Sequence, residues 1–121
     1  MKVRKIKIGI KDLKTVLDDF VKTGEAIERG EKVKTEKGVY FTSLEAFRKA
    51  LTSKRLELLR LIKKSRPKSL QELARIAKRD IKNVADDVKY LEQIGLVERQ
   101  ESKREVKPLV KYDLIDLQIA V

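Results

Sequence analysis

The chain has 121 residues, a length typical of one domain, and is 41% hydrophobic but only 5% aromatic, so its core must be built from Leu, Ile and Val. It contains neither Cys nor His, which excludes disulfides, thiolate or imidazole zinc sites and nucleophiles that depend on a histidine base. The formal net charge of +11 favours a polyanionic partner such as DNA, RNA or an anionic membrane, with solubility alone as the alternative. We therefore predict no catalytic residues, no metal site and no cofactor, and we predict that the protein is not an enzyme.

Charged residues make up 40% of the chain with both signs interspersed, as on a folded, solvated surface. The Lys-, Glu- and Arg-rich composition without cysteine is typical of proteins from hot environments. No apolar run approaches the length of a membrane span, and the N-terminus lacks a signal-peptide pattern. We expect no membrane partner and a cytoplasmic protein, associated with the nucleoid when bound to DNA.

The N-terminal segment predicts a strand. Residues 3–10 alternate, with Ile6, Ile8 and Ile10 on one face. Lys5 and Lys7 occupy the other face, and lysine at such positions is typical of an edge strand protected against aggregation. The period then changes to that of an amphipathic helix, which Asp12 caps and which ends near residue 30. Its apolar face is formed by Leu13, Val16, Leu17, Phe20, Val21 and Ile27.

A polar connector with a glycine at each end leads to a short strand at V-Y-F-T and a brief helix capped by Ser43. Thr52 caps a longer helix that must end before Pro67, because the residue before proline is pushed out of the helical region. The apolar stripe of this helix is wide enough to imply burial on more than one side. It consists of Leu56, Leu58, Leu59, Leu61 and Ile62.

The next two helices follow closely. S-L-Q-E at residues 69–72 is a capping box in which Ser69 accepts from the amide of Glu72 and Glu72 reaches back. After a break at K-R-D, Asp80 caps a helix closed by Gly95. We expect its inward face to be Ile81, Val84, Val88 and Leu91. Three helices with a short turn between the last two predict a helix-turn-helix.

The chain closes with β structure. L-V-E-R-Q and E-V-K-P-L-V-K-Y flank a polar turn and predict a hairpin, and L-I-D-L-Q-I-A-V predicts a final strand. Together these elements predict an α+β fold: a winged helix-turn-helix with an N-terminal strand and amphipathic helix and a C-terminal strand. We divide the chain into residues 1–50, an extension for dimerisation or packing, and residues 51–121, the DNA-binding domain with the C-terminal strand.

A resemblance supports this interpretation. L-T-S-K-R-L-E-L-L-R-L-I, S-L-Q-E-L-A and R-D-I-K-N-V-A-D-D-V-K-Y-L-E-Q-I-G-L-V-E together resemble prokaryotic winged-helix transcriptional regulators of the MarR/ArsR type. The chain is most similar to a small, largely archaeal group of DNA-binding, antitoxin-like proteins. The resemblance implies a sequence-specific regulator of double-stranded DNA, most simply a repressor, or alternatively a protein-interaction module or an antitoxin that neutralises a toxin partner.

We predict that the helix at residues 80–94 reads the major groove with the face opposite its apolar stripe. At 3.6 residues per turn, that face is formed by Arg79, Lys82, Asn83, Asp86, Tyr90 and Gln93, with Lys89 at its edge. Arg79 and Lys82 suit guanine or phosphate, and Asn83 suits adenine N6 and N7. A solvated helix face without a partner is the alternative.

Other residues are candidates for contacts to the DNA backbone. Ser69 and Gln71 start a helix whose amides and dipole favour a phosphate, with Lys68 beside them and Lys78 in the following turn. Lys103 and Arg104 occupy the predicted wing tip, where a basic side chain suits the sugar-phosphate backbone or the minor groove. A simple cap at Ser69 and an ordinary charged turn at the wing are the alternatives.

Asp86 and Asp87 are adjacent acidic residues in the helix that we predict to bind DNA. Neighbouring helical residues point about 100° apart, and no further ligand set lies nearby, so we predict no metal site. We predict that Asp87 braces the fold by bonding Asn83 or Arg55. Asp86 lies central on the reading face, where it either pairs with Lys82 and Lys89 and limits indiscriminate phosphate binding, or accepts from cytosine N4.

The ends of the chain supply spare apolar material. We predict a homodimer formed mainly by the N-terminal region, with the terminal strands as candidates for a shared sheet. In the alternative, these elements cover one another within a single monomer.

Overall fold

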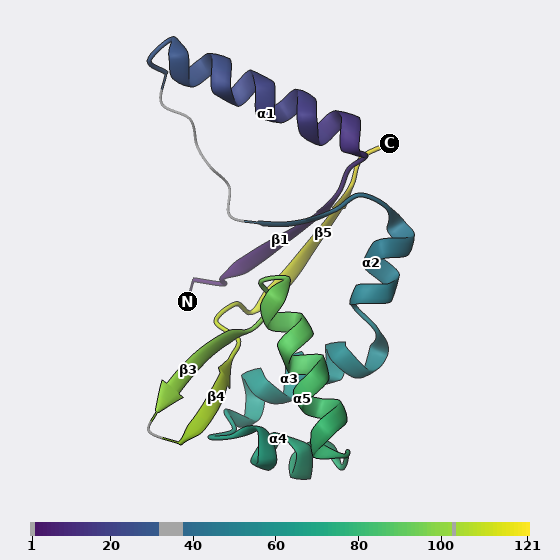
Figure 1. Ribbon diagram of the computed structural model, residues 1–121, viewed down its shortest axis with the longest axis vertical. Helices are drawn as coiled ribbons and strands as arrows, with labels where there is room; N and C mark the ends of the chain where they lie inside the picture. The colour runs from purple at the N-terminus through teal and green to yellow at the C-terminus, as the bar shows by residue number, and fades with distance from the viewer. Residues whose placement is uncertain (1, 32–37, 103) are drawn as a thin grey trace.

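The computed structural model describes residues 2–31, 38–102 and 104–121. Within them, β1 (Lys5–Ile10), α1 (Leu13–Glu28), β2 (Gly38–Phe41) and α2 (Leu44–Ala50) precede α3 (Ser53–Ser65), α4 (Leu70–Ala77) and α5 (Ile81–Gln93). The chain ends with β3 (Glu98–Ser102), β4 (Glu105–Leu109) and β5 (Leu114–Ile119). Figure 1 shows α1 at one end of the molecule, the sheet in the middle, and α3, α4, α5 and the β3–β4 hairpin at the other end. Each predicted element is present.

The sheet joins the two ends of the chain. Its strand order is β2-β1-β5, and both neighbours run parallel to β1. Ile6, Ile8 and Ile10 lie in register with Ile115, Leu117 and Ile119, so the predicted apolar faces of the first and last strands coincide. The terminal strands therefore pair within one chain.

The prediction that Lys5 and Lys7 protect an edge strand was wrong. β1 is the central strand of its sheet, hydrogen-bonded on both sides. The alternation of a strand reports which face is buried but carries no information about its neighbours, and here the neighbours come from residues far along the sequence.

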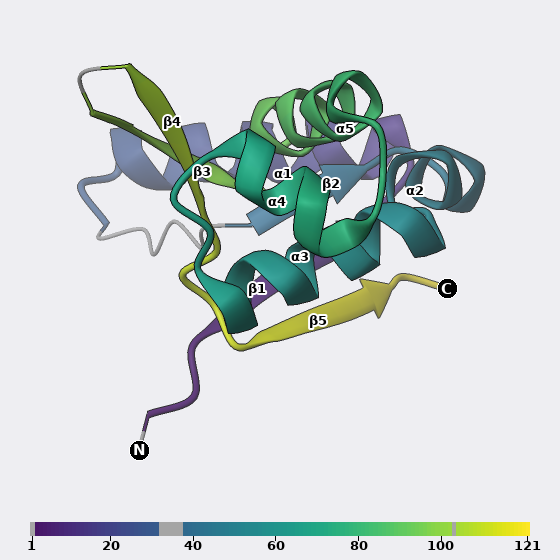
Figure 2. The same cartoon turned by 90° about the horizontal axis from the view of Figure 1, so that it is seen from below.

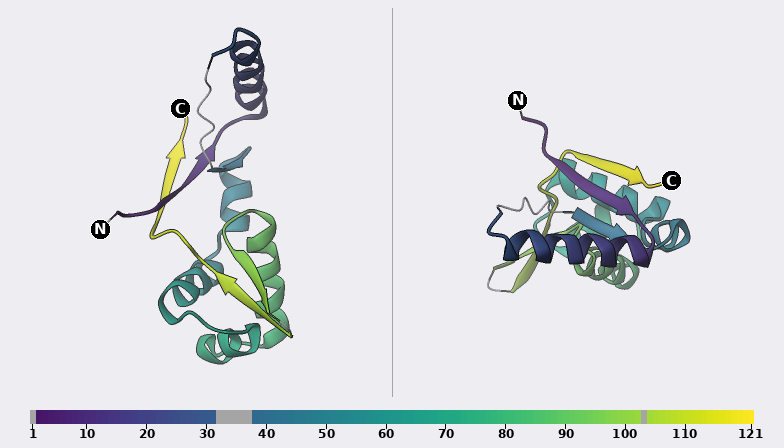
Figure 3. Two further views of the ribbon diagram at one scale, coloured as in Figure 1. Left: turned by 90° about the vertical axis from the view of Figure 1, so that its left-hand side faces the viewer. Right: turned by 90° about the horizontal axis from the view of Figure 1, so that it is seen from above.

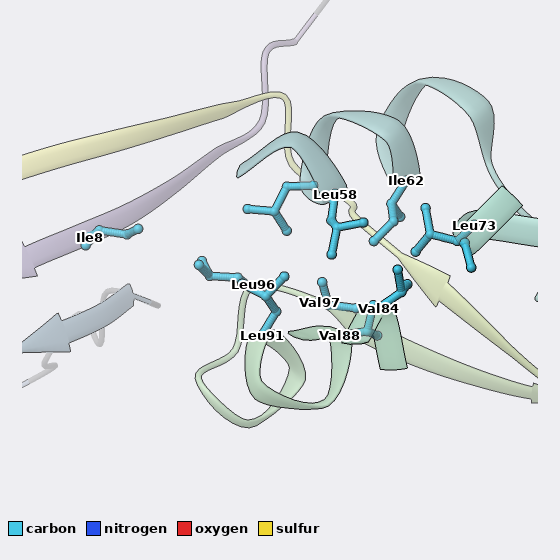
Figure 4. Packing of buried hydrophobic residues seen from close by; sticks show 11 residues of the cluster. Ile8, Leu58, Ile62, Leu73, Val84, Val88, Leu91, Leu96 and Val97 are labelled. Carbon is cyan, nitrogen blue, oxygen red and sulfur yellow. The ribbon is translucent and has the colours of Figure 1, made fainter. Parts of the chain in front are cut away.

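The core lies between the sheet and the three helices. Ile8 of β1 is fully buried and belongs to the same cluster as Leu58 of α3, Leu73 of α4 and Leu91 of α5. Figure 4 shows Leu58, Leu73 and Leu91 grouped with Leu96 and Val97, and Ile8 on β1 to one side of this group. The wide stripe of α3 is buried as predicted, since Leu58, Leu59 and Ile62 are all in the cluster. One core therefore contains residues from both segments into which we divided the chain, residues 1–50 and residues 51–121.

Helix ends are fixed by the side chains that the sequence indicated. Asp12, Ser43, Thr52, Ser69 and Asp80 each accept a hydrogen bond from an amide in the first turn of the following helix. The capping box differs in one detail, because the Glu72 carboxylate accepts from the amide of Lys68 at 3.2 Å and reaches one residue further back than expected. Gly95 adopts a φ of 90°, which closes α5 as predicted.

Two residues, Tyr112 and Asp113, anchor the segment between the hairpin and β5. The Tyr112 hydroxyl donates to the carbonyl of Leu96 at 2.9 Å, and burial raises the pKa of Tyr112. The Asp113 carboxylate accepts from the amide of Arg4 at 3.0 Å and pairs with Lys63 of α3 at 3.0 Å. These contacts join the sheet to the helices, although β1 and β5 lie at opposite ends of the sequence.

α1 is the exception to this packing. It has no buried residue, and its large apolar side chains other than the half-buried Val16 are exposed to solvent. Of the two alternatives for the ends of the chain, mutual cover within a monomer therefore holds for the terminal strands and not for α1. In the part of the chain that the structure describes, no helix is long and apolar enough to cross a membrane.

Candidate nucleic-acid interface

The helical part of the site consists of α4 and α5, which are joined by the three residues Lys78, Arg79 and Asp80. Lys78 takes a left-handed conformation with φ 55° and ends α4, and Asp80 then begins α5 by accepting from the amide of Lys82 at 2.8 Å. Seen from below, α3, α4 and α5 lie together and the β3–β4 hairpin projects to one side (Figure 2). The turn is as short as the sequence predicted.

α5 presents one fully polar side to solvent. Lys82, Asp86, Lys89 and Gln93 are exposed and recur at helical spacing, and we call this set with Asn83 the α5 stripe. Val84, Val88 and Leu91 lie on the buried side. The helix is therefore held by its apolar face while its polar face is free for a ligand, which is the arrangement that major-groove recognition needs.

The prediction that Ile81 faces the core was wrong, because its side chain is 43% exposed. Ile81 is the first residue of α5, so its side chain projects past the end of the core cluster. The helical period predicts the direction of a side chain around the helix. It does not predict how far along the helix the other core residues extend.

The prediction that Arg79 lies on the exposed face of α5 was wrong. Arg79 precedes the helix, so the helical period does not apply to it. The Arg79 side chain is only 19% exposed, and its Nη2 donates to Asp87 Oδ2 at 2.7 Å. Its Nη1 is buried and makes no hydrogen bond within the described chain. This guanidinium holds the turn against α5 and does not face outward with the α5 stripe.

Asp87 is the centre of a partly buried ionic group. In addition to Arg79, it accepts from Nε of Arg55 in α3 at 3.0 Å, and its own side chain is 18% exposed. Arg55 also donates to the carbonyls of Lys49 and Ala50 at the end of α2. Burial by itself raises the pKa of Asp87, but the hydrogen bonds from Arg79 and Arg55 together outweigh it, and the net pKa is lowered. The predicted brace is therefore confirmed with Arg55 and not with Asn83.

Tyr90 belongs to the same group. The Arg55 guanidinium lies over the Tyr90 ring, 4.1 Å from its centroid, and the tyrosine is half-buried. Asp86, one residue before Asp87, is exposed and forms no ion pair with Lys82 or Lys89 in the structure. The acidic pair thus divides into one partly buried carboxylate, Asp87, and one exposed carboxylate, Asp86.

A shallow hollow lies at the turn between α4 and α5. It brings together Gln71, Lys78 and Arg79, which the sequence predicted, with Arg75, which it did not. Gln71, Arg75 and Lys78 are spaced by four and three residues, so the helical period of α4 was a signal that could have identified Arg75. Lys68 is exposed and Ser69 half-buried at the start of α4.

The hairpin carries a mixed charge. Arg104 is exposed near its tip, while Lys103 lies outside the described residues. Arg99 of β3 pairs with Glu92 of α5 at 3.0 Å, and Lys111 pairs with Glu98 at 3.0 Å. Much of the basic charge around the base of the hairpin is therefore neutralised within the chain. No group of His, Cys, Asp and Glu suited to hold a metal ion occurs in residues 2–31, 38–102 and 104–121.

Three packed helices with a tight turn between the last two, followed by an antiparallel hairpin, define a winged helix-turn-helix protein. The predicted α+β fold class is confirmed. Residues 50–117, more than half of the chain, match the model of the HVO_A0114 family, and the chain belongs to that family.

One solved structure that resembles the chain is the homodimeric winged helix-turn-helix DNA-binding domain of Mb0332 from Mycobacterium bovis, a possible ArsR-family transcriptional regulator. The two share 14% sequence identity with a TM-score of 0.47, over 80% of this chain and 68% of that one. A search among curated proteins found no match.

Proposed function

We propose that this protein is a sequence-specific regulator of double-stranded DNA, most simply a repressor, that places α5 in the major groove. The observation that carries the proposal is the α5 stripe, which is exposed along the helix directly opposite the buried Val84, Val88 and Leu91. In this proposal Asn83 reads adenine and Lys82 and Lys89 contact guanine or phosphate.

The backbone contacts come from the residues around the α5 stripe. The start of α4 and the adjoining hollow offer amides, a hydroxyl and basic side chains to the phosphates on one side, and the wing offers Arg104 on the other. The set is Lys68, Ser69, Gln71, Arg75, Lys78 and Arg104. Arg79 and Tyr90 have a supporting role instead, because both are engaged with the Arg55 and Asp87 group.

A salt titration tests the proposal. Genomic fragments selected by the protein supply a duplex, and its dissociation constant is measured by fluorescence anisotropy at several salt concentrations. If about six phosphates are neutralised, log K falls against log[salt] with a slope of roughly −5. A protein-only module, including an antitoxin that acts solely on a toxin, would show no duplex binding to titrate.

Asp86→Ala is expected to strengthen binding to unrelated duplexes several-fold. The ratio of its affinities for selected and unrelated sequences should therefore become smaller. The exposed carboxylate lies between Lys82 and Lys89 on the α5 stripe, where it repels phosphate and lowers the local positive charge. Anisotropy with both duplexes measures the ratio. Unchanged affinity and unchanged preference would remove Asp86 from the interface.

A further inference from the structure

α1 carries an apolar surface that the described part of its own chain leaves uncovered. Five of its six large apolar side chains are each more than half exposed, while Val16 is half-buried. We call the exposed five the α1 stripe: Leu13 61%, Leu17 55%, Phe20 75%, Val21 56% and Ile27 61%. A single helix of 16 residues is marginal in water unless an apolar face is packed. The ion pair of Lys11 with Asp19 at 2.9 Å fixes its first half beside the end of β1 but covers none of the α1 stripe.

Gly24 lies in the middle of the α1 stripe. It follows Leu17 by seven residues, which places the two within about 20° of each other around the helix. A Cβ at Gly24 would meet no atom within 4 Å, and its φ is not in the left-handed region, so neither space nor backbone conformation within the described chain requires glycine. Glycine inside a helix is also less stable than alanine. A glycine at the centre of an apolar helix face instead allows a second helix to approach closely.

The arrangement is complementary to itself. If a second α1 runs antiparallel across a twofold axis placed between Phe20 and Val21, Leu17 of each copy meets the partner's Gly24. The same axis brings Phe20 beside the partner's Phe20 and Leu13 beside the partner's Ile27. Leu17 and Gly24 lie equally far from the axis on either side of it. The contact of Leu17 with the partner's Gly24 is therefore formed twice, once by each copy.

The charges beside the α1 stripe fit the same register. Lys14 near the start of α1 and Glu25 near its end border the stripe on the side of Val21, and Glu28 lies toward the same side in the last turn. An antiparallel partner brings Lys14 of one copy to Glu25 and Glu28 of the other, twice by symmetry. None of these three side chains forms an ion pair elsewhere in the part of the chain that the structure describes.

We propose that α1 is a homodimer interface in which two copies pair their α1 helices antiparallel, with Leu17 of each copy packed on the partner's Gly24. α1 lies at the opposite end of the molecule from α4 and the hairpin, as Figures 1 and 3 both show, so the interface leaves the DNA-binding surface free. The proposal does not depend on DNA binding, and it is tested without DNA.

The first test is the mass of the full chain by sedimentation equilibrium over a range of concentrations. The wild type is expected at twice 14.0 kDa. Gly24→Leu fills the gap and should raise the dimer dissociation constant roughly 10- to 100-fold, whereas Lys22→Leu, on the opposite side of α1, should leave it unchanged. Circular dichroism verifies that both variants keep their helix content. A monomeric wild type, or a Gly24→Leu dimer as tight as that of Lys22→Leu, would overturn the proposal.

Charge reversal tests the antiparallel register. Lys14→Glu alone and the pair Glu25→Lys with Glu28→Lys are each expected to weaken the dimer, because each places like charges together across the twofold axis. The three changes combined should restore affinity toward that of the wild type. Failure of the combined variant to recover would reject this register.

Discussion

Replacing Asp87 by alanine is expected to lower the free energy of unfolding by about 2–4 kcal/mol, equivalent to a melting temperature lower by about 10 °C. The change leaves the guanidinium groups of Arg55 and Arg79 without their carboxylate in surroundings where the side chains are only 20% and 19% exposed. Thermal and urea denaturation measure the effect. Affinity for DNA per folded molecule should change much less.

Asp86→Ala is the matched control, because it removes the neighbouring carboxylate of the same helix from an exposed position. Its free energy of unfolding should stay within about 0.5 kcal/mol of the wild type, as for most surface substitutions. If the two variants lose equal stability, the ionic group around Asp87 is not what fixes α5.

The loss of stability in Asp87→Ala depends on pH in a defined way. Because the folded-state pKa of Asp87 is lowered, its ion pairs contribute full stability above the ordinary value of 3.8, and that contribution is lost as the pH falls through the lower folded value. The difference in stability between wild type and Asp87→Ala should therefore be constant near neutral pH and shrink below 3.8. A difference that grows in acid would contradict the lowered pKa.

Asn83→Ala is expected to weaken binding to the selected DNA by about 1–3 kcal/mol and to relax preference at a single adenine. The reason is that an amide can both donate to and accept from the adenine edge, and Asn83 is the exposed asparagine of the α5 stripe. Anisotropy with the selected duplex and with single-base variants of it measures both effects.

Gln118→Ala is the control for Asn83→Ala, since it removes an exposed amide from β5, in the sheet rather than the helix-turn-helix. It should leave DNA affinity unchanged. If Asn83→Ala instead weakens all duplexes equally, Asn83 contacts the backbone and does not read a base.

The local elements could be predicted because their determinants are local. Caps such as Asp12 and Ser69 act within one turn, and the periods of two and 3.6 residues mark strands and helices directly. The place of Arg79 could not be predicted in this way. Its direction depends on Asp87 eight residues later and on Arg55 in another helix, and helical geometry says nothing of a residue in a turn.

The sequence by itself determined the helices and strands, the winged helix-turn-helix order and most of the exposed face of α5, because each follows from periodicity and capping within a short stretch. Only the tertiary structure decided that β1 is central between β2 and β5, that Asp87 joins Arg55 to Arg79, and that no described segment covers the exposed apolar face of α1. Those facts depend on which distant segments meet. A pattern of apolar and polar residues shows that a face needs a partner, but the partner itself is chosen by the packing of the whole chain.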